Sequence, residues 1–285
     1  MIVVGTRGSA LALAQAAIVT RALGGDVTVR IVKTAGDVSD RPIRELGDGV
    51  FVTAIEDALR RGDVDVAVHS LKDLPTEEAR DLIIAAIPER EDVRDVLVTR
   101  GRGGLGDLAA GGVVGTSSVR RAAFITALRP DVTCADIRGN VETRLRKVND
   151  GQYDATVLAA AGLRRLGVAF TPLEALDVAL CPPAPGQGAL ALQVRASDLA
   201  LRERVAALDD RRVRAAVTAE RELLRLLGAS CDIPLGAHGH WEGDDLVLDA
   251  ALASDSGIRR TSVRGRDALD LARRAADELG AVAHA

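Results

Sequence analysis

The chain has 285 residues, of which 47% are hydrophobic and 27% are charged, and its net charge is −4. This composition is typical of a folded protein of about two domains and excludes a disordered or collagen-like chain. The acidic balance and an aromatic content of only 2% argue against nucleic-acid binding, which needs a basic surface and, for single strands, aromatic rings on which bases stack.

The sequence predicts a cytoplasmic protein that does not contact a membrane. Its first residues run directly into strand-like sequence without the basic region of a signal peptide, and no stretch of about 18 uncharged apolar residues follows. Three cysteines, Cys134, Cys181 and Cys231, are widely spaced and form no Cys-x-x-Cys pair. They fit neither a disulfide framework nor a zinc site, so each is considered as a single thiol and no metal centre is predicted.

Short β-branched segments alternate with longer segments of helical periodicity, which predicts an α/β fold with mostly parallel strands. The predicted strands are residues 2–4, 27–32, 64–68, 96–98, 113–114, 155–158 and 190–194. The predicted helices are residues 11–23, 52–61, 119–128 and 141–148, in which apolar residues recur at spacings of three and four. A further helix is expected to start at residues 171–174, where Thr-Pro-Leu-Glu has the spacing of a capping box.

Two short sequence echoes predict an internal repeat. The sequence Val-Val-Gly-Thr occurs at residues 3–6 and again at 113–116, and the turn and strand at 62–68 resemble those at 151–157. The simplest account is two similar lobes with a ligand cleft between them. After the proline-rich residues 182–185 comes a helix-rich stretch at 197–227, which Gly228 ends, and a third unit is predicted to begin near residue 209. It continues with strand-like segments at 246–253 and 258–264 and a final helix at 268–279.

Cations gather in the second lobe. Residues 115–121 (Gly-Thr-Ser-Ser-Val-Arg-Arg) place hydroxyls and two arginines at a predicted helix start, where free backbone N–H groups attract anions. Alone, this turn fits ordinary hydroxyl capping with solvated arginines equally well. However, residues 116–147 contain seven basic and three acidic residues in a chain that is acidic overall. The sequence therefore favours a ligand with several carboxylates or phosphates.

The first lobe carries polar residues at the ends of two predicted strands. Arg7 and Ser9 follow the first strand, and His69, Lys72 and Asp73 follow the strand at 64–68. Ligands of open α/β sheets bind at this edge. A carboxylate at position 73 could stabilise a cationic intermediate or transfer a proton, or it could cap the turn before the proline that follows. The lone histidine is more often a hydrogen-bonded core residue.

Cys231 lies on a predicted loop, residues 229–236, between a helix end and a proline turn. A cysteine in such a loop could be an exposed nucleophile, although on spacing alone a buried structural thiol is the more common case.

Five segments together resemble porphobilinogen deaminases, also called hydroxymethylbilane synthases, in the order in which that family carries them. The segments are residues 68–75, 114–121, 138–140, 185–188 and 231–236. The resemblance implies an α/β fold of two periplasmic-binding-protein-like lobes with a cleft between them and a small α+β C-terminal domain. The implied domains are residues 1–90 with 189–206, residues 91–188 with the anion-binding helix starts, and residues 207–285, which anchor the cofactor.

The resemblance also implies the reaction. The family joins four molecules of porphobilinogen head to tail into hydroxymethylbilane, a linear tetrapyrrole, with release of ammonia at each step. The chain grows on a dipyrromethane cofactor held by a thioether, here to Cys231, and Asp73 would stabilise the azafulvenium-type cation and assist loss of the ring proton. A monomer is expected. The implied cofactor- and substrate-binding residues are Arg7, Ser9, Gln15, Phe51, Lys72, Thr116, Ser117, Ser118, Arg120, Arg121, Arg138, Gly139, Asn140, Arg144, Arg165 and Gln187.

One alternative from another class stays open at this point. A two-lobed anion-binding protein or regulator effector domain would share the lobe fold and could bind carboxylates at helix starts. Such a protein would need neither Cys231 nor Asp73. A secreted binder would carry a signal peptide and a regulator a helix-turn-helix domain, and the sequence shows neither.

Overall fold

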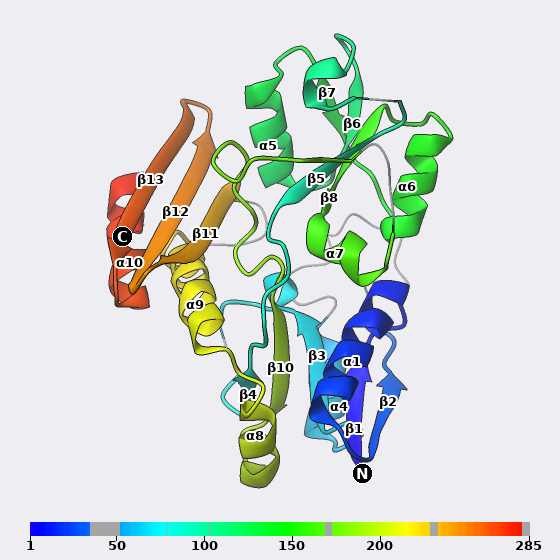
Figure 1. Ribbon diagram of the computed structural model, residues 1–285, viewed down its shortest axis with the longest axis vertical. Helices are drawn as coiled ribbons and strands as arrows, with labels where there is room; N and C mark the ends of the chain where they lie inside the picture. The colour runs from blue at the N-terminus through cyan, green and yellow to red at the C-terminus, as the bar shows by residue number, and fades with distance from the viewer. Residues whose placement is uncertain (35–51, 78, 102, 169–172, 229–232, 281–285) are drawn as a thin grey trace. The chain divides into compact units, whose positions relative to one another are not determined.

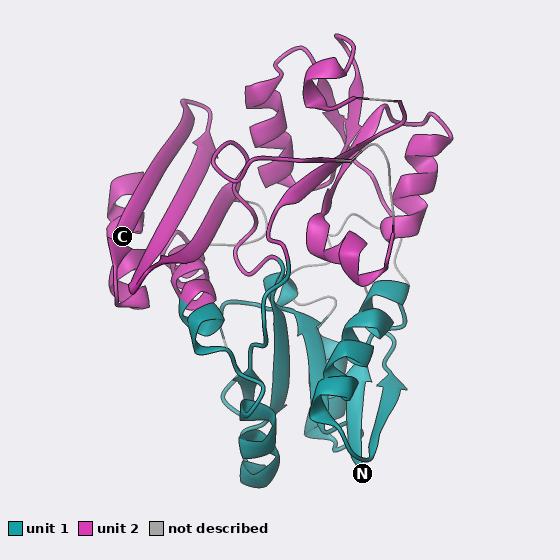
Figure 2. Ribbon diagram, viewed as in Figure 1, with its two compact units in different colours: residues 1–91, 188–215 teal, residues 92–187, 216–285 magenta. Residues whose placement is uncertain are grey.

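The computed structural model describes residues 1–34, 52–77, 79–101, 103–168, 173–228 and 233–280, and the chain divides into two compact units (Figures 1 and 2). Unit 1 comprises residues 1–91 and 188–215, and unit 2 comprises residues 92–187 and 216–285. Phe51 and Cys231 lie outside the described residues. Within the described ranges, no helix is long and apolar enough to cross a membrane.

Unit 1 is built on a five-stranded sheet of order β2-β1-β3-β10-β4. The strands are β1 (Ile2–Thr6), β2 (Val27–Ile31), β3 (Val66–Ser70), β4 (Leu82–Ala86) and β10 (Leu190–Arg195). Its helices are α1 (Ala10–Leu23), α4 (Thr53–Arg60) and α8 (Leu199–Ala206), and a short 3₁₀ turn, η1 (Leu71–Asp73), follows β3. Strands β1, β2 and β3 run parallel, whereas β10 is antiparallel to both β3 and β4.

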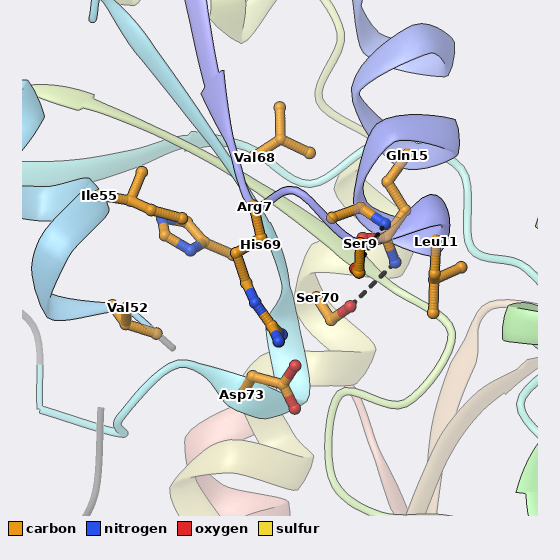
Figure 3. Close-up of a pocket in the computed structure, with 11 residues that line it drawn as sticks. Arg7, Ser9, Leu11, Gln15, Val52, Ile55, Val68, His69, Ser70 and Asp73 are labelled. Carbon is orange, nitrogen blue, oxygen red and sulfur yellow. Dashed lines mark hydrogen bonds between the residues drawn. The ribbon is translucent and has the colours of Figure 1, made fainter. Parts of the chain in front are cut away.

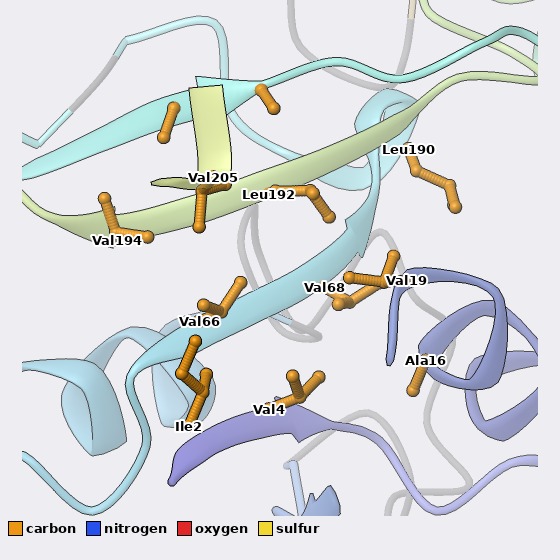
Figure 4. Packing of buried hydrophobic residues seen from close by; sticks show 12 residues of the cluster. Ile2, Val4, Ala16, Val19, Val66, Val68, Leu190, Leu192, Val194 and Val205 are labelled. Carbon is orange, nitrogen blue, oxygen red and sulfur yellow. The ribbon is translucent and has the colours of Figure 1, made fainter. Parts of the chain in front are cut away.

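The core of unit 1 follows from the alternation of side chains along its strands. Val66 and Val68 of β3 point to one face, where they join Leu192 and residues of α1 and α8 in one buried cluster (Figure 4). Ala67, between them, belongs to a second cluster together with Ile55 and other residues of α4. Both faces of the sheet are therefore covered, which leaves the strand ends as the part of the sheet open to a ligand.

The lobe sheet of unit 2 has the order β7-β6-β8-β5-β9. The strands are β5 (Asp95–Thr99), β6 (Val113–Gly115), β7 (Thr133–Ala135), β8 (Ala155–Ala159) and β9 (Leu173–Ala175), and η2 (Leu105–Asp107) follows β5. The helices are α5 (Val119–Leu128), α6 (Val141–Asn149) and α7 (Ala160–Arg165). Residues of α5 cover one face of this sheet, and residues of α6 and α7 cover the other.

The two lobe sheets share one topology, which confirms the two similar lobes predicted from the echoes. In each, three parallel strands are followed by an antiparallel fourth strand, β10 in unit 1 and β5 in unit 2. The prediction of mostly parallel pairing is wrong, because half of the strand pairs in each lobe sheet are antiparallel. The reason is the chain path, since each of these fourth strands enters its sheet directly from the segment that belongs to the other unit.

A second sheet of unit 2 is an antiparallel meander of β11 (Leu235–Glu242), β12 (Asp245–Ser254) and β13 (Gly257–Gly265) (Figure 1). It packs with α9 (Arg211–Leu226) and α10 (Ala268–Leu279). The strand-like segments and final helix predicted here are confirmed, and β11 is an addition to them. Glu220 of α9, fully buried, accepts hydrogen bonds from the backbone N–H groups of Gly186 and Gly239, both at 2.7 Å.

The prediction of a helix starting at residues 171–174 is wrong. The described part of this segment is strand β9, which pairs antiparallel with β5. Glu174, expected to close a capping box, instead accepts a hydrogen bond from the backbone N–H of Leu105 at 2.5 Å. Pairing with the free edge of β5 satisfies the backbone of these three residues, and that gain outweighs a local helix-start signal.

Candidate functional site

The carboxyl ends of three parallel strands, β7, β6 and β8, lie at one edge of the lobe sheet of unit 2. Residues 116–118 follow β6, residues 138–140 follow β7, and α7, whose last turn carries the half-buried Arg165, follows β8. The antiparallel strand β5 begins at the same edge with Asp95, which pairs with Ala159 at the end of β8. The topology therefore brings the predicted cationic segments of unit 2 to one edge.

The three hydroxyls after β6 organise the turn itself. Ser118 is the N-cap of α5, and its Oγ accepts a hydrogen bond from the backbone N–H of Arg121 at 3.4 Å. Thr116 Oγ1 accepts from the backbone N–H of Ser118 at 3.2 Å. Ser117 Oγ donates to the carbonyl of Ile137 at 2.9 Å and accepts from the N–H of that residue at 3.1 Å. These bonds fix the turn after β6 against the loop after β7.

Arg120 and Arg121 are buried against one carboxylate, that of Asp95. Arg121 donates to Asp95 Oδ1 from Nε at 3.1 Å and from Nη2 at 2.6 Å, and Arg120 donates to Oδ2 at 2.7 Å. Each arginine also donates to a backbone carbonyl, that of Pro182 from Arg120 and that of Val157 from Arg121. The two cations at the start of α5 are therefore tied to β5, β8 and the segment that follows residue 180.

Asp95 is a functional candidate that the sequence analysis missed. Burial by itself would raise its pKa, but the charges of Arg120 and Arg121 and their hydrogen bonds outweigh burial and hold the pKa well below its usual range. The carboxylate is therefore ionised inside the protein. A signal was present in the sequence, because an aspartate directly precedes the apolar residues 96–98, and a charge at the start of a buried strand requires partners.

Gln187 and Cys181 complete this buried cluster. Gln187 Nε2 donates to Asp95 Oδ1 at 2.9 Å and to the carbonyl of Val93 at 2.8 Å. Cys181 Sγ lies 4.0 Å from Asp95 Oδ2, and burial together with this carboxylate raises the pKa of the thiol to about 11. Gln187, which the resemblance assigned to ligand binding, thus also has a structural task.

The loop after β7 forms the start of α6. Asn140 caps the helix, and its Oδ1 accepts from the backbone N–H of Thr143 at 2.9 Å. Gly139 has a φ of +115°, and a Cβ at this position would lie 2.5 Å from Cγ2 of Thr143, so only glycine fits. Arg144 donates from Nε to the carbonyl of Gly139 at 2.8 Å, which holds its guanidinium back against the loop that carries Arg138.

Positive charge converges around Arg144. Burial, and then the nearby charges of Arg121 and Arg138, lower the pKa of the Arg144 guanidinium to about 10. Arg121 of α5 and Arg138 of the loop after β7 thus repel Arg144 of α6 in a partly buried region. An anion bound here would relieve that repulsion, which is the property expected of a carboxylate-binding site.

Unit 1 has a pocket at the carboxyl edge of β1 and β3 (Figure 3). Its lining residues are Arg7, Ser9, Leu11, Ala12, Gln15, Val52, Ile55, Val68, His69, Ser70 and Asp73. Ser9 is the N-cap of α1 and accepts from the backbone N–H of Ala12 at 3.3 Å. Gln15, buried, donates from Nε2 to Ser70 Oγ at 2.9 Å and so joins α1 to the end of β3. The structure therefore brings four predicted residues, Arg7, Ser9, Gln15 and Asp73, into one pocket.

Asp73 is the exposed carboxylate of this pocket. It lies on η1, and Figure 3 shows the side chains of Arg7 and Asp73 directed toward each other. Lys72, also on η1, is half-buried and lies outside the pocket lining. In the part of the chain that the structure describes, the Asp73 carboxylate accepts no hydrogen bond. It is therefore available to a ligand, and the alternative of a turn cap before Pro75 has no hydrogen bond to support it.

His69 is a buried histidine of the same pocket. Burial lowers its pKa to about 4, and the neighbouring amide of Gln193 offsets this only in part. The imidazole is therefore neutral near neutral pH. It adds no positive charge beside Asp73, which leaves Arg7 as the cation of the pocket lining.

The two described cysteines are poor nucleophiles. Burial raises the pKa of Cys134, and the pKa of Cys181 is raised to about 11 as described above. At neutral pH both thiols are protonated, and the thiolate is the reactive form. Cys231, the predicted attachment point, lies outside the described residues.

The fold and these sites define a class: a two-lobed α/β protein whose strand ends carry an exposed carboxylate in one lobe and converging arginines in the other. Residues 2–203 match the family described as porphobilinogen deaminase, dipyromethane cofactor binding domain, and residues 214–281 match porphobilinogen deaminase, C-terminal domain. The chain belongs to the porphobilinogen deaminase family, whose members are transferases that carry a dipyrromethane cofactor.

The chain is similar to porphobilinogen deaminases of several bacteria over most of its length and of theirs. The chain is 46% identical to the porphobilinogen deaminase of Roseiflexus sp. strain RS-1, covering 98% of this chain and 95% of that one. It is 47% identical to that of Thermus thermophilus, covering 98% and 93%. A solved substrate-binding domain of a putative amino acid ABC transporter from Streptococcus pneumoniae is 13% identical at a TM-score of 0.44, covering 72% of this chain and 90% of that one. The family membership supports the deaminase interpretation and not the anion-binding or regulator alternative.

The low pKa of His69 predicts a pH dependence of stability. In the unfolded chain this imidazole titrates near its ordinary pKa of 6.5, whereas in the fold it titrates near 4. Between these values the unfolded chain binds a proton that the folded chain does not, so the free energy of unfolding falls as the pH is lowered from 6.5 towards 4. The full loss is about 3 kcal/mol. Urea unfolding of the wild type and of His69→Gln over this range measures it, and equal pH slopes for the two would contradict the prediction.

Replacing Asp95 with asparagine should be strongly destabilising. The amide keeps the shape but leaves two buried guanidinium groups without their counter-charge, which costs about 3–5 kcal/mol in the free energy of unfolding. The matched control is Asp131→Asn, which removes a carboxylate paired with Arg129 at 2.7 Å on the surface of the same unit. That change should cost far less, because solvent screens an exposed ion pair. Denaturant titrations compare the two, and similar losses would show that the Asp95 cluster is not a special constraint.

Proposed function

We propose that this protein is a hydroxymethylbilane synthase, which joins four porphobilinogen molecules head to tail and releases ammonia at each step. The observation that carries the proposal is the convergence of Arg121, Arg138 and Arg144 at one sheet edge. Porphobilinogen carries an acetate and a propionate on its pyrrole ring, so a growing chain presents many carboxylates that need such cations. The protein is further proposed to act as a monomer in the cytoplasm, and to divide into the three domains given by the sequence analysis.

The residues present fit a dipyrromethane cofactor. Its two pyrrole rings carry four carboxylates in all, and unit 2 offers Arg138 and Arg144 beside the capped starts of α5 and α6, where backbone N–H groups also favour anions. When bound, dipyrromethane supplies the terminal pyrrole carbon to which the first substrate is joined. Thr116, Ser117, Ser118, Gly139, Asn140 and Arg165, from the same edge, are proposed to shape this site.

We assign a mainly structural role in cofactor binding to Arg120, Arg121 and Gln187, which hold the binding site in place. They donate hydrogen bonds to Asp95 and to backbone carbonyls, which fixes the start of α5. The Nε of Arg120 has no hydrogen-bond partner among the described residues, so one N–H donor of this guanidinium is unused within that part of the chain. A rigid α5 start holds Ser118 and the repelling cations in place before any carboxylate arrives.

Asp73 is proposed as the catalytic carboxylate. Departure of ammonia from porphobilinogen leaves positive charge on the substrate pyrrole, and a fixed carboxylate stabilises that charge as it develops. After the new carbon–carbon bond forms, the same carboxylate assists removal of the ring proton. Arg7, Ser9, Gln15 and Lys72, in the pocket or beside it, are proposed to bind carboxylates or to orient them, and Phe51 is proposed to contact the cofactor.

Asp73→Asn tests the catalytic assignment. The amide keeps size and shape and removes the charge, so bilane formation and ammonia release should fall by about 10²–10³ while the cofactor stays bound. Glu77→Gln, which neutralises an exposed carboxylate four residues further along the chain, is the matched control and should turn over normally. Intact mass establishes cofactor content in each sample. Near-normal turnover by Asp73→Asn would remove the carboxylate from the mechanism.

Cys231 is proposed as the attachment residue, because the thiols of Cys134 and Cys181 are held protonated and the family segment at 231–236 contains the third. Intact mass spectrometry of protein purified from a tetrapyrrole-producing host should show an adduct of two pyrrole units. The adduct should be missing from Cys231→Ser and present in the control Cys134→Ser. An adduct that persists in Cys231→Ser would reject the attachment but leave the role of Asp73 open to its own test.

A further inference from the structure

The meander of unit 2 carries two histidines and an aspartate on one face. His238 and His240 are two residues apart on β11, so their side chains point to the same face of the sheet. Asp249 of β12 lies directly opposite His238 in the strand register and therefore shares that face. The opposite face packs against helices: there Gly265, paired with Leu246, lies beside Leu271 of α10.

The three side chains approach as closely as metal ligands do. One possible ligand atom from each lies within 4.8 Å of the others. A tetrahedral zinc ion with ligand bonds of about 2.1 Å requires its donor atoms to be about 3.4 Å apart. Nδ1 of His240 and Oδ2 of Asp249 are 3.6 Å apart, and the two imidazole rings are stacked with centroids 5.0 Å apart. Small side-chain rotations would bring all three donors to one ion.

The surroundings of His240 match those of a metal-binding histidine. Its Nδ1 is shielded from solvent and makes no hydrogen bond in the part of the chain that the structure describes. On the other side of the ring, Nε2 lies 3.5 Å from Oε1 of Glu242. A carboxylate at the second ring nitrogen fixes the tautomer and strengthens the first nitrogen as a ligand. Glu242 is in turn paired with Arg264, which orients it.

The cluster lies close to solvent, although Nδ1 of His240 itself is shielded. The side chains of His240 and Asp249 are 31% and 40% exposed. Two imidazoles and one carboxylate, with a position left for water, are typical ligands for zinc and related transition metals, whereas magnesium and calcium prefer oxygen ligands only.

We propose that His238, His240 and Asp249 form a binding site for a divalent transition-metal ion, with zinc as the expected ion. Bound there, the ion would cross-link β11 to β12 and stabilise the meander. The site uses none of the residues assigned to porphobilinogen chemistry, so the proposal does not depend on the proposed function. The spacing of the cysteines gave no sign of a metal centre, whereas the signal in the sequence is a His-x-His pair on a strand and a carboxylate nine residues beyond the second histidine.

Zinc competition against a chromophoric chelator tests the site in the cofactor-loaded protein. The wild type should bind one equivalent of zinc. His240→Ala and Asp249→Asn should each weaken binding by at least about 100-fold, since even loss of an outer partner of a zinc ligand costs about 10–100-fold. The matched control is Asp245→Asn, which removes a carboxylate from the same face of β12, where it lies 3.6 Å from Arg266. This variant should bind zinc as the wild type does.

A second readout separates this site from binding to thiols. Cobalt substituted for zinc should give a visible spectrum of nitrogen and oxygen ligands without a thiolate charge-transfer band. Zinc should also raise the melting temperature of the wild type and of Asp245→Asn but not that of His240→Ala, whose melting temperature without metal serves as the check on folding. Equal zinc affinity in all variants, a thiolate band, or no zinc binding by the wild type would each overturn the proposal.

Discussion

One buried carboxylate organises unit 2. Asp95 opens β5 inside the protein and is neutralised by Arg120 and Arg121 from α5, with Gln187 as a further donor. A buried carboxylate without partners would be very costly, so these groups must be in place whenever the lobe is folded. The cluster thereby joins two segments about ninety residues apart in sequence to the start of α5. It also fixes the position of the turn at residues 116–118 and of the arginines that follow it.

That constraint explains how one edge can both stay folded and attract anions. Two of the arginines have their charge partly compensated by Asp95, whereas Arg144 experiences Arg121 and Arg138 as neighbours of like charge. This repulsion lowers the stability of the folded protein at this edge, and a bound ligand with several carboxylates would offset it. Unit 1 is different in character: its pocket holds a neutral His69, one exposed Asp73 and the cation Arg7, a setting suited to stabilising positive charge on a substrate.

Local sequence signals predicted much of the fold because they depend on neighbouring residues only. Periodicity located α1, α4, α5 and α6 and most lobe strands, and the Val-Val-Gly-Thr echo identified the two similar lobes. The errors arise where distant segments meet. Strands β10 and β5 insert antiparallel after crossing between units, and β9 forms a strand because it pairs with the edge of β5. Pairing energy from a partner far along the chain overrides a local helix signal.

The sequence by itself determined the fold class, the family segments and the residue types that carry the chemistry, since those are properties of order and composition. Only the tertiary structure decided which partner each charged side chain contacts. It showed that Arg120 and Arg121 turn inward to Asp95, that Gln187 is buried with them, and that His238, His240 and Asp249 meet across two strands. The physical reason is that electrostatic energy depends on distance and burial, and both are set by packing between segments that are far apart in the chain.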